Sequence, residues 1–148
     1  MRRISLLALA LMATTVAVAV PAQAANHETT SNKCQPLAVS YVVSGMLVSG
    51  ALTADPGTAK TYSGTLTVHV TKTNNHAKVD KSLTKTYALS LADVSFGAGV
   101  NKRPPAAGSR VNLKGTITTL APKCSQTGFT PTITITKVEI HRAKTPKA

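Results

Sequence analysis

The side chains that could carry acid–base chemistry are few and widely spaced in this 148-residue chain. Its five acidic residues are Glu28, Asp55, Asp80, Asp93 and Glu139. A glycosidase needs two carboxylates that face each other across the sugar, and no two of these residues have a sequence setting that suggests such a pair. The carboxylates therefore do not indicate an active site.

The histidines give no stronger sign of catalysis or of metal binding. The four are His27, His69, His76 and His141, and they are scattered. The chain has no H-E-x-x-H motif and no serine or cysteine nucleophile motif. We predict that the protein is not an enzyme, and that it has no metal site and no cofactor.

Basic side chains are the better candidates for a function. The chain has 17 Lys and Arg against five acidic residues, a formal net charge of +12, and such an excess attracts polyanions. The candidate polyanion-binding residues are Lys72, Lys78, Lys81, Lys85, Lys102, Arg103, Arg110, Lys114 and Phe129, the last being an aromatic residue in a predicted loop. The alternative is that lysines of 72–85 only protect a strand edge from aggregation, so the basic surface could be merely solubilising.

The first 24 residues have the pattern of a signal peptide. Arg2 and Arg3 precede an apolar run over 4–20, and Ala22-Gln23-Ala24 is a small-x-small cleavage motif. Cleavage removes two basic residues and no acidic one, which leaves 15 basic and five acidic residues and a formal charge of +10. We therefore predict a secreted or extracytoplasmic protein, and no later stretch is apolar enough to span a bilayer.

Export also decides how the cysteines are interpreted. Cys34 and Cys124 are the only two in the chain, and in an oxidising compartment they predict one disulfide. Closing a loop of about 90 residues is worth on the order of 4–5 kcal/mol in the chain-entropy model.

Between a flexible leader at 25–33 and a flexible tail at 143–148, the domain over 34–142 reads as all-β. Runs rich in Thr, Val, Ile and Leu, separated by turn residues, predict strands at 37–53, 61–72, 85–96, 109–120 and 132–141. Gly45 and Gly50 interrupt the long first strand and indicate bends. The inward residues expected for the third strand are Tyr87, Leu89, Leu91, Val94 and Phe96, with a bulge near 92–93. A second bulge is expected near 136–137, and no helix is expected.

The passage GSRVNLKGTI, followed by a loop and ITITKVEIH, resembles strands 4 and 5 of the oligonucleotide/oligosaccharide-binding (OB) fold. The chain also resembles small uncharacterised secreted proteins of actinomycete-like bacteria. The resemblance implies a five-stranded OB-like barrel, with a small β-sandwich as the alternative, although immunoglobulin-like sandwiches usually have about seven strands. Many OB domains carry a helix between strands 3 and 4, whereas the prolines of 97–108 disfavour one here. In an OB barrel strand 1 runs antiparallel to strand 4, which would bring Cys34 within disulfide range of Cys124.

The expected function is an exported, non-catalytic binding or envelope-associated module for an anionic cell-envelope polymer or glycan. One alternative is a structural or scaffolding protein without a discrete ligand. The other is single-stranded nucleic-acid binding by an OB face, which needs aromatic stacking platforms. Tyr62 and Tyr87 are expected to point into the core, so nucleic acid is not the expected partner. The sequence does not indicate an oligomeric state.

Overall fold

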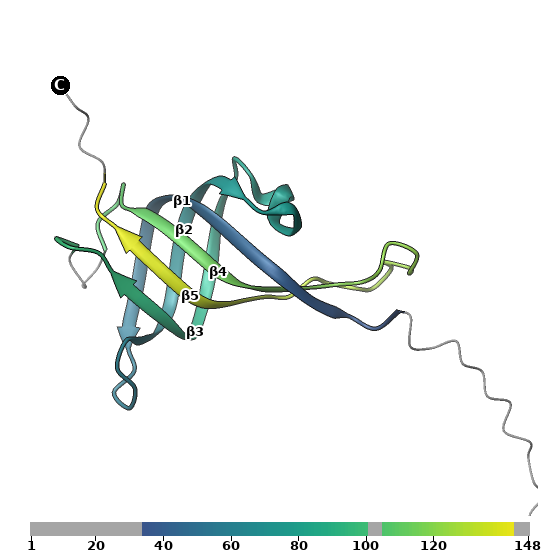
Figure 1. Cartoon of the computed structure of the whole chain (residues 1–148), viewed down its shortest axis with the longest axis horizontal. Coiled ribbons are helices and arrows are strands. Elements are labelled where there is room, and N and C mark those ends of the chain that lie inside the picture. Colours follow the sequence, from purple (N-terminus) through teal and green to yellow (C-terminus); the bar gives the residue numbers. More distant parts are fainter. Residues whose placement is uncertain (1–33, 101–104, 144–148) are drawn as a thin grey trace, which may run out of the picture.

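The computed structural model describes residues 34–100 and 105–143, which form five strands and one short helix (Figure 1). The elements are β1 (Leu37–Ala54), β2 (Thr61–Thr73), the 3-10 helix η2 (Asn75–Asp80), β3 (Thr84–Phe96), β4 (Arg110–Thr119) and β5 (Ile133–His141). The predicted all-β class is confirmed, and each predicted strand ends within one residue of the observed position. The predicted signal peptide, leader and most of the tail lie outside the described residues.

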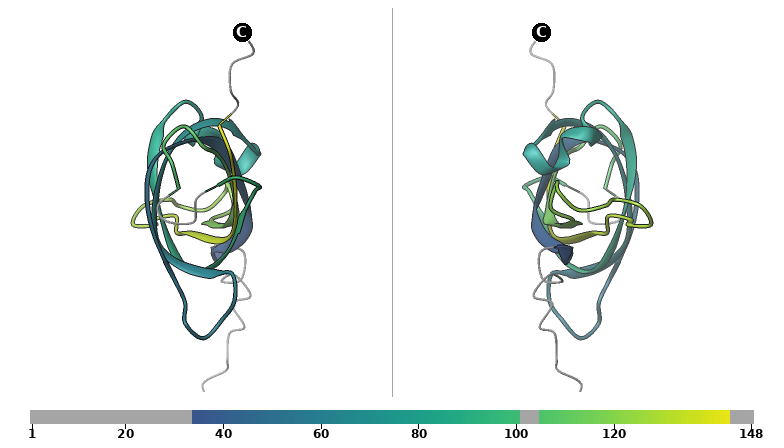
Figure 2. Two further views of the ribbon diagram at one scale, coloured as in Figure 1. Left: turned by 90° about the vertical axis from the view of Figure 1, so that its left-hand side faces the viewer. Right: turned by 90° about the vertical axis from the view of Figure 1, so that its right-hand side faces the viewer.

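The strands close into a barrel in the order β1-β2-β3-β5-β4, and β4 pairs back onto β1. All neighbouring strands are antiparallel except β3 and β5, which are parallel. Figure 2 shows the strands surrounding one interior. The predicted five-stranded barrel is therefore confirmed, and the alternative of a β-sandwich is wrong.

Strand β1 belongs to both sides of the barrel because it changes partner along its length. Its Leu37–Met46 part pairs with β4, and its Val43–Ala54 part pairs with β2. The pairing with β2 shifts register between Ser44 and Gly45 and again between Leu47 and Ser49. The interruptions expected from Gly45 and Gly50 are thus found as two irregularities close to these glycines.

The barrel interior is filled by side chains that alternate along each strand, as the period of two requires. Leu66, Val68 and Val70 of β2 are fully buried, and so are Tyr41 and Val43 of β1. The predicted bulge near 136–137 is confirmed, because Thr136 and Lys137 are both exposed between buried Ile135 and Val138.

The inward position predicted for Leu91 is wrong. Leu91 is 63% exposed, and Ala92 is fully buried instead. The backbone of Leu91 has a φ of 53°, and the register of β3 with β5 shifts between Leu89 and Asp93. The irregularity therefore begins one residue earlier than the hydrophobic pattern suggested, and it turns Leu91 to the outside.

Two segments, 34–40 and 117–134, continue beyond the barrel and pair with each other as an arm (Figure 1). Within the arm, β1 pairs with β4, beginning with Leu37 opposite Thr119. The predicted disulfide between Cys34 and Cys124 is confirmed, with the two Cα atoms 5.5 Å apart. It lies at the outer part of the arm, so it ties the ends of the β1–β4 seam rather than the barrel wall.

The helix η2 is the element that the sequence prediction missed. Asn74 caps its start, since the Asn74 side chain accepts a hydrogen bond from the Ala77 N–H. Ala77 and Asp80 turn inward and are buried. The Tyr41 hydroxyl donates a hydrogen bond to Asp80, and the Lys85 ammonium lies 2.9 Å from the same carboxylate. This six-residue helix is thereby fixed to the barrel by side chains of β1 and β3.

Candidate functional site

A groove of about 360 Å³ crosses the outside of the barrel where β1 bends. Four strands contribute to its lining, which consists of Ser44, Gly45, Met46, Thr71, Lys72, Arg110, Val111, Asn112, Glu139 and His141. Gly45 allows β1 to approach β2 here, because a Cβ atom on Gly45 would lie 2.0 Å from the carbonyl oxygen of His69. The bend that positions the groove therefore depends on the absence of a side chain at this residue.

Two cations stand on opposite sides of β1 in this groove. Lys72 of β2 pairs with Ser44, and Arg110 of β4 pairs with Met46. Both cationic residues are exposed. Within 34–100 and 105–143, the ion pairs involve other lysines, namely Lys85, Lys114 and Lys137. Lys72 and Arg110 are therefore available to an anionic ligand.

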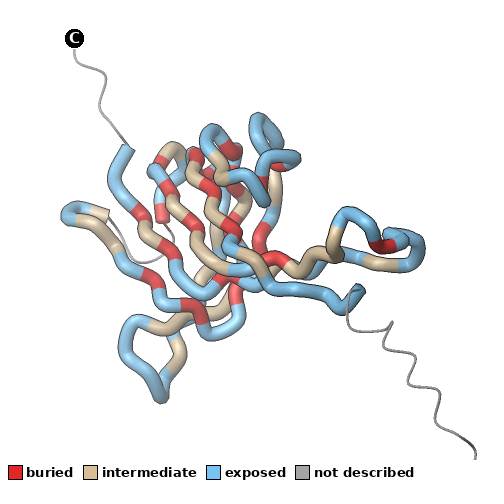
Figure 3. Tube along the Cα trace, turned by 45° about the vertical axis from the view of Figure 1, so that its right-hand side comes forward, coloured by how far each residue is buried: buried red, intermediate tan, exposed pale blue. Residues whose placement is uncertain are grey.

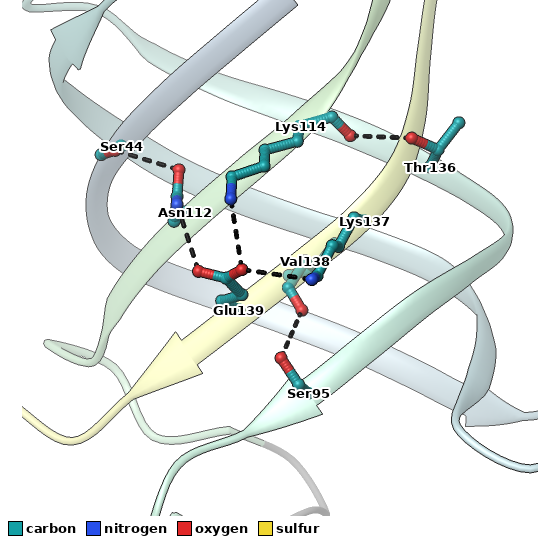
Figure 4. A network of polar contacts seen from close by, with 8 residues as sticks. All are labelled: Ser44, Ser95, Asn112, Lys114, Thr136, Lys137, Val138 and Glu139. Atoms are coloured by element: carbon teal, nitrogen blue, oxygen red, sulfur yellow. Dashed lines mark hydrogen bonds and ion pairs between the residues drawn. The ribbon is translucent and has the colours of Figure 1, made fainter.

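The one carboxylate that lines the groove is already neutralised (Figure 4). Glu139 accepts hydrogen bonds from the Asn112 amide and the Lys114 ammonium, each at 3.3 Å. Lys137 lies 3.5 Å from the same carboxylate. These contacts, the Asn112 hydrogen bond first and Lys114 second, hold the pKa of Glu139 below its ordinary value. Glu139 therefore stays ionised, and its charge is balanced by the two lysines.

Hydroxyl and amide groups lie between the charges. The Ser44 hydroxyl donates to the Asn112 side-chain oxygen at 3.2 Å, which continues the network from β5 across β4 to β1. The Thr71 hydroxyl donates to the carbonyl oxygen of Ser44 at 3.2 Å. Such groups can bind the hydroxyls of a sugar or polyol.

A second, shallower hollow extends the groove toward η2. It measures about 230 Å³ and is lined by Val42, Ser44, Lys72, Thr73 and Asn74. Ser44 and Lys72 line both hollows. The two hollows are therefore neighbours along β1, and Lys72 is accessible from both.

The predicted polyanion-binding residues do not all gather at this groove. Lys72 and Arg110 line it, and Lys114 lies beside it in the Glu139 network. Lys85 is paired with Asp80 instead.

The remaining candidates are elsewhere. Lys78 and Lys81 are exposed at η2 and just after it. Phe129 is partly buried in the arm. Lys102 and Arg103 lie outside the described residues. The sequence prediction also missed Ser44, Thr71, Asn112 and His141. Their outward parity on neighbouring strands was readable, but the bend that brings four strands to one hollow was not.

The described residues contain no cluster of three or more His, Cys, Asp or Glu that could hold a metal ion. Over the same ranges, no helix has the length and apolar character needed to cross a membrane. The buried polar cluster of Asp80, Tyr41 and Tyr87 is closed on itself, since the two tyrosine hydroxyls lie 3.0 Å apart and Asp80 is paired with Lys85. This cluster supports η2 and does not line the groove.

Comparisons of the chain with protein-family models, with curated proteins and with solved structures give no match. The groove, its two available cations and its neutralised carboxylate are therefore the features from which a function can be argued.

Proposed function

We propose that this domain is an exported, non-catalytic module that binds an anionic cell-envelope polymer, such as a polyol phosphate or an acidic glycan, along the groove. The observation that carries the proposal is the position of Lys72 and Arg110. They flank β1 in an open hollow and have no carboxylate partner among the described residues. Beside them, Ser44, Thr71 and Asn112 offer hydrogen-bonding groups for the sugar or polyol part of the ligand.

The location proposed for this activity is outside the cytoplasm. The signal-peptide pattern of residues 1–24 supports it. The Cys34–Cys124 disulfide is compatible with it, because such bonds persist in oxidising compartments. There, wall polymers and glycans are the abundant polyanions, and a protein with a strongly positive charge is drawn to them.

The strand order supports an OB-like relationship as part of the proposal. OB barrels have five strands and bind oligonucleotides or oligosaccharides across a face of the barrel. The described groove lies over β2, β1, β4 and β5, and not over the β2–β3 face that OB domains commonly use. A ligand would therefore run on the side of the barrel where β1 bends.

Nucleic acid is a less suitable ligand because the groove offers no large aromatic platform. None of the residues that line it is Phe, Tyr or Trp, and His141 is the one ring in its lining. Tyr41 and Tyr87 are buried, while Tyr62 and Phe96 pack against each other with ring centres 5.5 Å apart. Single-strand binding that is independent of sequence normally uses aromatic platforms for the bases. The chemistry of the groove instead fits recognition of phosphate or carboxylate together with hydroxyl groups.

Binding of fluorescently labelled poly(glycerol phosphate), measured by anisotropy over a series of salt concentrations, tests the proposal. The double variant Lys72→Ala/Arg110→Ala should weaken binding roughly tenfold at low salt, because two available cations are lost. The wild-type affinity should fall as salt rises, and the variant should show a shallower salt dependence.

A control with the same charge change separates the groove from the general basic surface. Lys60→Asn/Lys123→Ala also removes two positive charges, and asparagine tolerates the positive φ of 67° at residue 60. This control should change the affinity less than about threefold. Equal losses in the two double variants would contradict the groove, and no binding at low salt would favour the scaffolding alternative. Tighter binding to a single-stranded oligonucleotide than to the polymer would favour the nucleic-acid alternative.

A further inference from the structure

Residues 78–83 present two apolar side chains to solvent at a part of the molecule that stands out from the barrel (Figure 1, Figure 3). Val79 is 80% exposed and Leu83 is 52% exposed. Lys78 and Lys81, on either side of Val79, are exposed as well. A solitary exposed apolar residue is ordinary, but here two lie within one short turn among lysines.

The fold fixes this exposure. Asp80 is 5% exposed and is bound by the Tyr41 hydroxyl and the Lys85 ammonium. In a 3-10 helix residues three apart share a side, so Ala77 and Asp80 face the barrel together and Val79 lies on another, exposed side.

The far end of the segment is fixed by main-chain hydrogen bonds. The Ser82 N–H donates to the Val70 carbonyl at 2.9 Å, and the Val70 N–H donates to the Leu83 carbonyl at 2.8 Å. Residues 78–83 are therefore attached to β2 and to the barrel end, and they hold their apolar side chains outward in a defined arrangement.

We propose that residues 78–83 dock the domain on an anionic lipid bilayer. Val79 and Leu83 enter the interfacial region, and Lys78 and Lys81 contact the headgroup phosphates. Charge complementarity favours an anionic bilayer at this surface. The one acidic residue of the segment, Asp80, is buried and paired with Lys85, and the whole chain has a net charge of +12. An aqueous polymer would satisfy the lysines but would leave the apolar side chains in water, whereas a bilayer interface accepts both kinds of group.

This docking site is separate from the groove and goes beyond the proposed polymer binding. None of the residues 78–83 lines the groove or its extension toward η2. Loss of polymer binding and loss of lipid binding can therefore be caused by different substitutions.

The first test is co-sedimentation of the disulfide-bonded protein with vesicles of equal parts phosphatidylcholine and phosphatidylglycerol. Lys78→Ala/Lys81→Ala should weaken binding about 20- to 30-fold, given the usual contribution of a basic residue close to an anionic surface. Val79→Ser/Leu83→Ser keeps every charge and should still weaken binding roughly three- to tenfold. Val48→Ser, at another position that is 48% exposed, should leave it unchanged. Unaltered binding of Val79→Ser/Leu83→Ser, with its fold verified by circular dichroism, would overturn the proposal.

The second test reports insertion directly. The chain contains no tryptophan, so Val79→Trp introduces a single fluorescent reporter. Its emission should shift to the blue on anionic vesicles and should be quenched by brominated phospholipid, while Val48→Trp on the same vesicles should show neither effect. The signal of Val79→Trp should persist when Lys72→Ala/Arg110→Ala is added, because the groove is a different site. An unshifted Val79→Trp emission on bound protein, or equal responses at residues 48 and 79, would refute insertion and indicate charge attraction alone.

Discussion

At the scale of single residues, Gly45 has the greatest influence on the candidate groove. It lies where β1 leaves the direction of β4 and follows β2, and its Cα is so close to β2 that a methyl group would meet the His69 carbonyl oxygen at 2.0 Å and Val68 Cγ1 at 2.8 Å. Backbone atoms cannot move aside as a flexible side-chain end can, so a substitution here has to displace a strand.

Gly45→Ala should therefore lower the free energy of unfolding by about 2 kcal/mol or more, as overpacked sites do, and should widen or close the groove. Gly57→Ala is the matched control, since its added methyl group would meet Asp55 Oδ2 at 3.6 Å, an ordinary contact. That control should stay within about 0.5 kcal/mol of the wild type. Urea unfolding of the three proteins measures both effects. Equal stability of Gly45→Ala and wild type would show that β1 can bend without this close approach.

Individual residues were predictable where alternation is regular. The alternation over 61–72 and 109–120 places five apolar residues on the inner face of their strands, and all are buried: Leu66, Val68, Val70, Val111 and Leu113. Parity could not locate the irregularity at Leu91, because Leu91 and Ala92 are consecutive apolar residues and either could have been buried. It also could not show that Lys85, in contrast to Lys72, meets a buried carboxylate, since that contact needs the turn at η2.

At the scale of elements, η2 depends on a cluster that connects β1, β3 and the helix. The Tyr41 hydroxyl contacts Asp80 and lies 3.0 Å from the Tyr87 hydroxyl, and the Lys85 ammonium lies 5.8 Å from the centre of the Tyr87 ring. Removing one donor leaves a buried carboxylate with fewer partners, which costs free energy. Tyr41→Phe should therefore destabilise the protein by about 1–3 kcal/mol at neutral pH.

The same cluster predicts a loss of stability in alkali. Burial, together with the hydrogen bond to Asp80, raises the pKa of Tyr41, and burial raises the pKa of Tyr87. Above pH ~10 the unfolded chain releases these phenolic protons while the folded chain keeps them. The free energy of unfolding must then fall as pH rises, by up to about 1.4 kcal/mol per pH unit for each such tyrosine.

Urea unfolding between neutral pH and strong alkali, on wild type and Tyr41→Phe, measures this effect. The free energy of unfolding of Tyr41→Phe should be lower at neutral pH and should fall less steeply as pH rises, because this variant lacks one of the two phenolic protons. Tyr62→Phe, which alters a tyrosine outside the cluster, should cost less than about 0.5 kcal/mol at neutral pH. Parallel pH curves for the wild type and Tyr41→Phe would show that Tyr41 does not keep its proton in the way the cluster requires.

The strands could be predicted from the sequence, and η2 could not. Five runs of β-favouring residues with a period of two give five strands almost to the residue. The six residues of η2 are too short for a helical period to be visible. They form a helix because Asn74 caps them and because Tyr41, 39 positions before Asp80, supplies a partner inside the barrel. That partnership exists only after the strands have assembled.

At the scale of the whole molecule, the disulfide connects two regions that are 90 residues apart in the sequence. Replacing both Cys34 and Cys124 by serine should lower the free energy of unfolding by about 4–5 kcal/mol in the chain-entropy model. Urea unfolding of the wild type with and without a reducing agent should show the same difference, and the double serine variant should not respond to the reagent. A loss below about 1 kcal/mol would mean that pairing in the arm restrains these ends without the bond.

The barrel as a whole was predictable because its evidence was redundant. The number of strands and the bend of the first strand point to a small barrel, and the OB resemblance implies a first strand beside the fourth, with which the two cysteines agree. Leu37 does pair with Thr119. The arm was not predictable, because nothing in the pattern of β4 and β5 marks where they leave the barrel. The groove was predictable only in its basic residues, because its shape is a property of four strands together.

Because β1 pairs with both β2 and β4, it also determines the order in which the barrel can form. The second half of β1 can pair with β2 as soon as β2 is made, because only a short turn separates them. The first half can pair only after β4, whose last residue is Thr119, has been made. During synthesis a chain that ends before β4 can pair β1, β2 and β3, which leaves β1 and β3 as unpaired edges. Most of the sequence must therefore be made before the cylinder can be sealed, and until then the chain remains an open, unfinished sheet.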